Sequence, residues 1–107
     1  MSDPAHGEQS ARCRQSVCCV CLAYGERQRS RTESHHELPI GHVSNRGRDR
    51  AELDADCIPL CGDHHRERHD KGFGAFWERH NRVDWVEVRD AMRRPMMIWD
   101  ALQLQGP

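Results

Sequence analysis

The sequence predicts an α+β fold in which a two-stranded ribbon and the helix that follows it share metal ions, with further helices behind them. The first observation behind this prediction is that cysteines and histidines recur at the spacings of metal ligands. The second is that these residues begin or end short segments with strand and helix patterns. The residues concerned are Cys18, Cys21, His35, His36, Cys61, His64, His65 and His69.

Length and composition favour a single domain that needs metal for its stability. The chain has 107 residues, of which 36% are hydrophobic, and a mean hydropathy of -0.91. A domain of this size buries little apolar area, so a bound metal is an expected staple. No run approaches the ~20 apolar residues of a membrane span, and we expect a soluble protein without a membrane partner.

The six cysteines could instead form disulfides. Residues 1–11 are polar and turn-rich and hold no apolar signal segment, so we expect this segment to be disordered and the cysteines to stay reduced in the cytoplasm. We expect a single domain over residues 12–104, with a core at 18–72 and a helical tail at 73–104.

The first elements are a cysteine knuckle and a strand. A C-x-x-C turn at residues 18–21 lets two sulfurs converge on one ion. After a polar stretch, residues 32–36 form a plausible short strand that Pro39 ends. Residues 41–54 are loop-like, with Gly41 and Gly47 as breaks.

A second strand completes the predicted ribbon, and a helix is predicted to follow it directly. Residues 56–60 should pair with the first strand, with Pro59 marking the end of the ladder. We expect Gly62 to take the left-handed conformation of a knuckle and Asp63 to cap a helix that runs to about Asp70. Gly72 should close that helix.

The tail is predicted to be helical and apolar on one face. Phe73, Phe76 and Trp77 offer a surface that packs onto the preceding helix. Further on, Asp84-x-x-Glu87 has the form of a capping box. The apolar residues after it recur at helical spacing until Pro95, and more apolar residues follow: Trp85, Val88 and Met92, then Met96, Ile98, Trp99 and Leu102.

Two knuckles together make a complete tetrahedral zinc site. Cys61-x-x-His64 has the same spacing as Cys18-x-x-Cys21, and the four residues form a Cys3His set with no open position. A closed set of this kind implies a structural rather than a catalytic zinc. Cys57 is a rival to His64 for the fourth place, and Cys13 and Cys19 are expected to bind no metal.

A second metal site is predicted on the same helix. His65 and His69 are four residues apart and lie on one helical face, whereas His64 is rotated by about 100° from His65. His35 could supply a third imidazole from the end of the first strand if the alternation of side chains relaxes there, which would leave His36 facing a substrate. Three imidazoles leave open positions for water and a phosphate oxygen, and His36, which binds no metal, could accept a proton from the water.

The net charge is -1, so the overall charge does not indicate a polyanionic partner. Arginines cluster, however, on both sides of the histidine pair, which favours contact with phosphate. These runs are Arg27, Arg29 and Arg31 before it, and Arg46, Arg48 and Arg50 after it. With Arg66 on the predicted helix, the second run supplies the candidate nucleic-acid contacts.

Over residues 18–72 the chain resembles the HNH endonucleases, also called the His-Me finger or ββα-metal family, and in particular small phage and prophage HNH-like proteins. The resemblance rests on a C-x-x-C, an E-x-H-H and a P-L-C-x-x-H-H-x-x-x-H that follow in this order. It implies a ββα-metal core and a metal-dependent DNA endonuclease, encoded by a phage or prophage. By the resemblance His35 binds the catalytic metal, His36 is the general base, and His65 and His69 are the helical ligands.

The cofactors expected are one structural Zn2+ and a catalytic Mg2+ or Mn2+, although three imidazoles also suit Zn2+ or Ni2+. The partner expected is DNA, with a second copy of the chain or a phage protein as a further possibility. Either Asp56 or Asn45 matches the asparagine that helps to hold the base in this family. Glu33 and Glu37 either orient the imidazoles or are simply exposed. His80 is expected to be an ordinary polar residue, and His42 is that, an extra ligand or a phosphate contact.

Two other functions remain open at this point. One is a non-catalytic, zinc-stabilised module that binds nucleic acid or serves as an adaptor, in which the histidines only hold metal. The other is a thiol redox switch built on Cys18, Cys19 and Cys21. A cleavage assay and a metal count separate the three functions.

Overall fold

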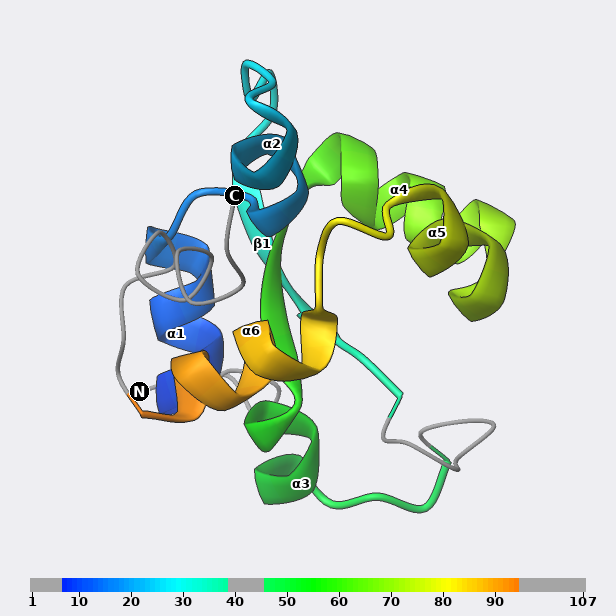
Figure 1. Ribbon diagram of the computed structural model, residues 1–107. Coiled ribbons are helices and arrows are strands. Elements are labelled where there is room, and N and C mark those ends of the chain that lie inside the picture. The colour runs from blue at the N-terminus through cyan, green and yellow to red at the C-terminus, as the bar shows by residue number, and fades with distance from the viewer. Residues whose placement is uncertain (1–6, 39–45, 95–107) are drawn as a thin grey trace.

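The computed structural model describes residues 7–38 and 46–94, which form a mixed α/β domain with a two-stranded antiparallel sheet (Figure 1). Its elements in chain order are α1 (Glu8–Gln15), α2 (Cys19–Tyr24), β1 (Thr32–His36), α3 (Arg50–Ala55), β2 (Cys57–Cys61), α4 (Gly62–Lys71), α5 (Phe73–Arg79) and α6 (Trp85–Arg93).

The ribbon pairs the two strands in a register that runs from Thr32 opposite Cys61 to His36 opposite Cys57. Both predicted strands are confirmed, the second shifted by one residue. Pro59 does not end the ladder as expected, but lies within β2, opposite Ser34. Because Gly62 donates to the Arg31 carbonyl and hydrogen-bonded pairs alternate along the ladder, Pro59 occupies a position whose N–H would point away from β1.

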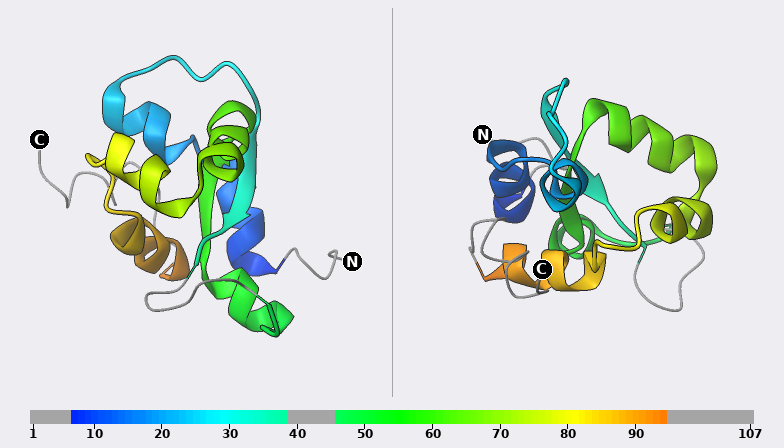
Figure 2. Two further views of the ribbon diagram at one scale, coloured as in Figure 1. Left: turned by 90° about the vertical axis from the view of Figure 1, so that its right-hand side faces the viewer. Right: turned by 45° about the horizontal axis from the view of Figure 1, so that its top comes forward.

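Helices cover both sides of the ribbon. Helix α1 contacts both strands from one side and α4 contacts both from the other, as the right-hand view of Figure 2 shows. Helix α6 packs on β2 and α1. All five residues of β2 are buried, and they join the apolar side chains of α5 and α6 in one core, which includes Ile58, Leu60, Phe76, Val88 and Met92.

Helix α1 corrects the expectation that residues 1–11 are disordered, because residues 8–11 belong to it. Gln9 and Ser10 are buried. Their backbone N–H groups donate to the Asp54 carboxylate at 3.2 and 2.9 Å, and the Gln9 side chain donates to the Cys57 carbonyl at 2.9 Å. A polar segment is therefore ordered by partners about 45 residues away. Residues 1–6 lie outside the described part of the chain.

Helix α3 lies inside the segment that was expected to be a loop. Asp49 caps it by accepting a hydrogen bond from the Glu52 N–H at 2.9 Å. Residues 39–45, with Pro39, His42 and Asn45, are outside the described residues.

The glycines take other roles than predicted. Gly62 has no positive φ and is the first residue of α4, where a Cβ would lie 3.3 Å from Ser30 Oγ. The left-handed residue near the knuckle is Gly25 (φ 65°), which ends α2. Gly72 (φ 86°) ends α4 as expected, whereas Cys61 rather than Asp63 occupies the N-cap position.

The beginning of the tail is helical as predicted, and Asp84 caps α6 by accepting from the Glu87 N–H at 3.2 Å. Trp85, Val88 and Met92 are buried in the core, and residues 95–107 lie outside the description. The longest described helix has 10 residues, so none in this part of the chain has the length and apolar character of a membrane span.

Candidate metal centres

Four predicted ligands converge where α2, the end of β2 and the start of α4 meet. His64 Nδ1 lies 3.4 Å from Cys18 Sγ, 3.5 Å from Cys21 Sγ and 3.3 Å from Cys61 Sγ. The sulfurs of Cys21 and Cys61 are 3.9 Å apart. Cys18, Cys21 and Cys61 are buried and His64 is half-buried.

These distances fit a zinc ion at the centre of a tetrahedron. With Zn–S bonds of about 2.3 Å and a Zn–N bond of about 2.0 Å, the edges of a regular tetrahedron are about 3.8 Å between sulfurs and about 3.5 Å between sulfur and nitrogen. The chain therefore brings together four soft donors that could hold a metal such as zinc.

Local structure positions each of these ligands. Cys18 occupies the N-cap position of α2, and its Sγ accepts a long hydrogen bond from the Cys21 N–H at 3.5 Å. Cys61 ends β2 directly before α4. Cys57, the rival fourth ligand, is not in this group; its thiol lies 3.5 Å from the Leu53 carbonyl instead.

His64 has two further neighbours that the sequence analysis did not connect with it. The His80 ring lies 5.3 Å from the His64 ring, and His80 Nε2 lies 2.8 Å from Glu67 Oε1. One ligand atom from each of the three residues falls within 4.8 Å of the others. Since His64 turns Nδ1 to the sulfurs, this pair can orient its ring from the other side. His80 is thus more than the ordinary polar residue expected. It lies 16 positions after His64 in the sequence, and no spacing motif links the two residues.

A second group of ligands lies between β1 and α4. His35 is buried on β1, His65 is half-buried and His69 is exposed on α4. The His35 ring is 5.0 Å from that of His65 and 5.4 Å from that of His69, and the two α4 rings are 4.8 Å apart. A ligand atom from each lies within 4.8 Å of the others, so the three predicted residues are together.

Carboxylates contact two of these imidazoles, as the first of the two alternatives for Glu33 and Glu37 requires. His65 Nδ1 lies 2.7 Å from Glu33 Oε1, and His35 Nε2 lies 3.2 Å from Glu37 Oε2. Each ring therefore has its other nitrogen left for a metal ion, an arrangement typical of histidine ligands. Glu33 is 54% exposed, whereas Glu37 is fully buried.

Glu37 is the centre of a buried polar network. It accepts two hydrogen bonds from the Arg68 guanidinium at 2.9 and 2.7 Å, one from the Trp77 indole at 2.6 Å and one from the Leu38 N–H at 2.8 Å. Sequence reasoning connected neither Arg68 nor Trp77 with Glu37, because they lie 31 and 40 residues away from it.

The buried surroundings of His35 and Glu37 shift the pKa values of both side chains. Burial lowers the pKa of His35 to about 4, so the ring is neutral, the form that binds metal, although Glu37 opposes the shift. Burial also raises the pKa of Glu37, but the hydrogen bonds from His35 and Arg68 outweigh it and the pKa falls to about 2. Glu37 is therefore a carboxylate at neutral pH.

The predicted general base lies on the other side of the strand. Glu33, His35 and Glu37 alternate along the chain and contact α4 or one another, whereas Ser34 accepts a hydrogen bond from Ser10 of α1 at 2.6 Å. The register is unbroken through His36, so the alternation does not relax there as expected. His36 is half-buried, shares the side of Ser34 and is not among the three grouped imidazoles.

Asp56, one of the two candidates to support the base, is buried in an ion-pair network. It contacts the guanidinium groups of Arg48, Arg89 and Arg93. These arginines come from the segment before α3 and from α6, so Asp56 joins that segment to α6. Asn45, the other candidate, lies outside the described residues.

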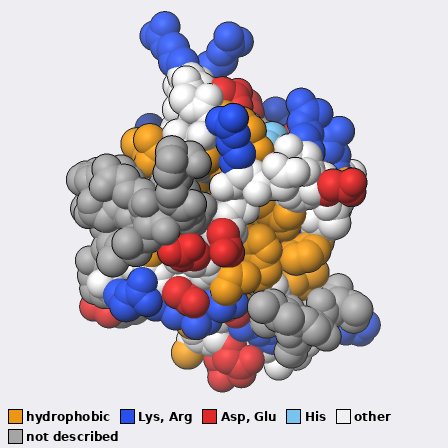
Figure 3. Space-filling view, in the orientation of Figure 1, with side chains coloured by type: hydrophobic (Ala, Val, Ile, Leu, Met, Phe, Trp, Pro, Cys, Tyr) orange, Lys and Arg blue, Asp and Glu red, His pale blue; other side chains and the backbone are white. Residues whose placement is uncertain are grey.

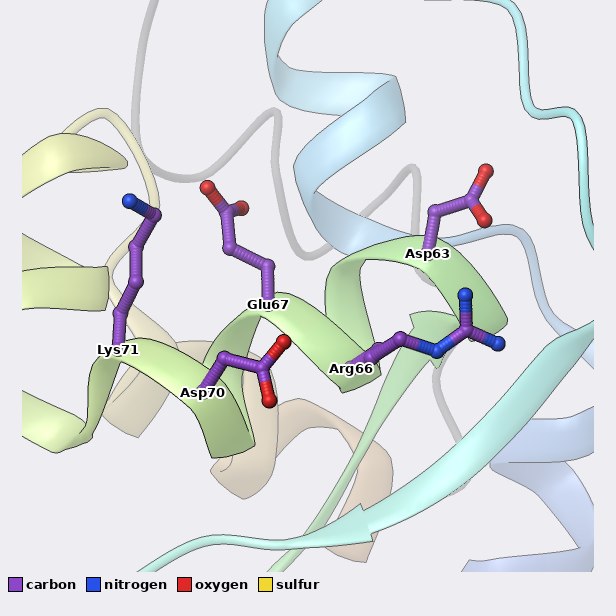
Figure 4. Close-up of a pocket in the computed structure, with 5 residues that line it drawn as sticks. All are labelled: Asp63, Arg66, Glu67, Asp70 and Lys71. Carbon is purple, nitrogen blue, oxygen red and sulfur yellow. The ribbon is translucent and has the colours of Figure 1, made fainter.

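The candidate phosphate contacts differ in their environments. Arg46, Arg50 and Arg66 are exposed. Arg48 is paired with Asp56 and its side chain is only 9% exposed, so contact with phosphate would require that pair to open. Figure 4 shows Arg66 on α4 beside residues of both charges, in a hollow of about 330 Å³ lined by Asp63, Arg66, Glu67, Asp70 and Lys71.

The thiols outside the Cys3His group have no lowered pKa that would make them reactive. Cys13, Cys19 and Cys57 are free and buried. Burial raises the pKa of Cys57 to about 12 and that of Cys19 well above its usual value. Because the thiolate is the reactive form, Cys19 does not favour the redox switch.

No family model, curated protein or solved structure matches this chain.

Proposed function

We propose that this chain is a metal-dependent DNA endonuclease of the HNH type, which hydrolyses phosphodiester bonds. The observation that carries the proposal is the group of His35, His65 and His69 between a strand and a helix. This group offers three donors, one fewer than a tetrahedral ion takes. Next to it lies a complete set of four donors, to which His64, the neighbour of His65 in the sequence, belongs. The contrast favours a structural ion in one site and a reactive ion in the other.

The three imidazoles would hold a divalent cation, which would stabilise the negative charge that develops on the phosphate and on the leaving oxygen. Glu33 and Glu37 keep two of the rings in position for it. Mg2+ or Mn2+ is our first choice, and Zn2+ and Ni2+ also suit nitrogen donors.

His36 is the residue we assign to take the proton from the attacking water, because it directly follows a ligand of the reactive ion and belongs to neither ligand group. Because His36 lies on the opposite face of β1 from His35, the phosphate that is cut would have to lie at the end of β1, where both residues stand. Arg46, Arg50 and Arg66 are exposed and would bind the backbone without reading sequence. The phage origin and the bacterial cytoplasm remain predictions.

The test is a plasmid-nicking assay with folded, zinc-loaded protein, in Mg2+, Mn2+, Zn2+, Ni2+ or EDTA. We expect nicking that needs added metal. His36→Ala should slow it by about 100-fold or more while metal content and DNA binding stay unchanged. An exposed variant of α5, Glu78→Ala, is the control and should cut like the parent. A His36→Ala protein that cuts as well as the parent overturns the assignment of the base.

The alternative is a non-catalytic, zinc-stabilised module that binds nucleic acid or serves as an adaptor. The observation that favours it is the orientation of His36 away from the three grouped imidazoles. Metal-loaded protein that binds DNA but leaves it intact in all four metals would support this function instead.

A further inference from the structure

The segment between α2 and β1, residues 25–31, projects from the body of the molecule (Figure 1). Lys and Arg side chains stand out at the top of the space-filling view, where this loop lies (Figure 3). Arg27, Arg29 and Arg31 occupy every second position of the loop, and all three are exposed. The proposed function makes no use of them.

The residues between these arginines fasten the loop to the body. Gln28 accepts a hydrogen bond from the Cys18 N–H at 2.8 Å and donates to the Ser30 carbonyl and to Thr32 Oγ1, both at 2.7 Å. Ser30 Oγ accepts from the Asp63 N–H at 3.0 Å. Inward polar contacts thus alternate with outward arginines.

This fastening gives the loop a defined shape before any partner arrives. Two of its anchors, the N–H groups of Cys18 and Asp63, belong to a ligand of the zinc group and to the residue before another, His64. A backbone that is already ordered loses less conformational entropy on binding. The arginines are therefore presented by a preorganised segment.

The loop also lies close to the open histidine group. The Arg31 carbonyl accepts a hydrogen bond from the N–H of Gly62, the first residue of α4, at 3.0 Å. His65 and His69 follow on the same helix, about 4.5 and 10.5 Å further along its axis at 1.5 Å per residue. Phosphates of one DNA strand are spaced by about 3.4 Å along the duplex axis. The distances along the helix axis from Gly62 to His65 and to His69 thus correspond to roughly one to three phosphate spacings.

The charges around the loop are mixed, and the guanidinium groups of the three arginines outnumber the carboxylates of Glu26 and Asp63 by one. Glu26 and Asp63 line a hollow of about 430 Å³ with Arg27 and Arg29, and this hollow reaches the zinc ligands Cys21, Cys61 and His64. The two carboxylates offset part of the charge of the three guanidinium groups. The planar guanidinium matches phosphate oxygens.

We propose that Arg27, Arg29 and Arg31 bind the phosphate backbone of DNA next to the open histidine group. The inference rests on the proposed function for the nature of the polymer, and it adds a second contact surface that is set by the zinc-anchored loop. Such contacts position the backbone and are independent of base sequence.

The test measures binding of a labelled DNA duplex by fluorescence anisotropy over a salt series. The parent for this test carries His65→Ala and His69→Ala and is zinc-loaded, so that no cleavage disturbs the measurement. With Arg27→Gln, Arg29→Gln and Arg31→Gln combined, we expect affinity at low salt to fall about tenfold or more and the slope of log K against log salt to decrease by roughly 2 to 3.

The matched control combines Arg14→Gln, Arg79→Gln and Arg94→Gln, three exposed arginines on α1, at the end of α5 and after α6, and removes the same charge. We expect it to keep the slope of the parent. An equal loss in both triple variants, or an unchanged slope in the loop variant, overturns the inference. If the loop triple variant loses zinc, the three single variants decide, each with an expected decrease in slope of about 0.9.

Failure of this inference and failure of the proposed function give different results. If the chain with its histidines intact cuts DNA but the loop variant keeps its slope, only the inference fails. If the intact chain binds DNA with the expected slope but does not cut it, only the proposed function fails. A chain that binds no duplex even at low salt refutes the inference.

Discussion

The two candidate metal centres share α4 and differ in almost everything else. His64 points to three buried sulfurs, whereas His65, the next residue, points to two imidazoles on a surface that becomes more exposed toward His69. A rotation of about 100° between neighbouring helical residues separates the two groups. The comparison teaches that two adjacent histidines can face two different groups of donors when they lie at the start of a helix.

The two groups also differ in their donor atoms and in the side chains that surround them. The Cys3His group is closed and its donors are three sulfurs and one imidazole, so it suits an ion that stabilises the fold. The three-histidine group is held by carboxylates that leave one nitrogen of each of two rings available. A stability measurement should therefore report on the first group, and a reaction should report on the second.

The largest expected effect is the loss of the fold when the closed group is broken. Structural zinc contributes about 10 to 16 kcal/mol of apparent binding free energy in zinc-finger peptides, which equals or exceeds the stability of a typical domain. We expect Cys61→Ser, or chelation of the parent, to abolish cooperative thermal unfolding followed by circular dichroism.

Cys57→Ala on the same strand is the control, because Cys57 is also buried but lies outside the ligand group. It should keep one zinc per chain. A Cys57→Ala protein without zinc would make Cys57 the fourth ligand and contradict the role of His64.

The neighbouring histidines offer the next test. His65→Ala should lower nicking by about 100-fold or more, as expected when a metal ligand of a catalytic ion is lost, while one zinc and the thermal midpoint remain. His64→Ala should instead lose zinc and the fold. Metal counting by mass spectrometry and a thermal melt distinguish the two, and identical behaviour of the two variants would mean that the groups are not separate.

The two carboxylates differ in burial, so their removal should differ in stability. Glu37→Gln leaves the Arg68 guanidinium buried without its counter-charge, and we expect a loss of about 3 kcal/mol in urea unfolding. Glu33→Gln, at a half-exposed position, should cost less than about 1 kcal/mol. Equal costs would show that the Glu37 network does not stabilise the fold.

The pH dependence of this difference has a defined sign. The pKa of Glu37 is lowered from 4.5 to about 2, so the ionised form stabilises the folded state above pH 4.5. That contribution is lost as the pH falls from 4.5 toward 2. The stability gap between the parent and Glu37→Gln should therefore narrow over this range, and a gap that widens would contradict the ion pair.

The smallest expected effect concerns the groups behind His64. Glu67→Gln or His80→Phe should weaken zinc binding by about 10-fold to 100-fold in a chelator competition, because residues that orient a ligand typically have effects of this size. Arg79→Gln serves as control, since Arg79 contacts Glu67 at 3.4 Å but is largely exposed. Unchanged zinc affinity in both test variants would show that His64 needs no orientation by them.

The sequence was informative at several positions where the relevant geometry is local, although it missed the capped start of α3 at Asp49. The C-x-x-C turn, the rotation between His64 and His65, the capping role of Asp84 and the end of α4 at Gly72 all depend on a few successive residues. Their spacing alone predicts them. It was misleading for Gly62, whose small size serves a close approach to Ser30 rather than a left-handed turn.

Long-range partners could not be predicted from spacing. Helix α1 is polar in sequence and becomes ordered by Asp54 and by the Cys57 carbonyl. The choice of His64 over Cys57 as the fourth ligand, and the network of Arg68 and Trp77 around Glu37, likewise depend on how distant segments pack.

By itself, the sequence determined the types of donor atom and their grouping along the chain, because helical and turn geometry fix the directions of residues a few positions apart. Only the tertiary structure decided that Cys57 stays outside the Cys3His group, which side chains surround Glu37 and that His36 lies across the strand from His35, because those relations depend on the pairing register and on helices that pack from both sides of the ribbon.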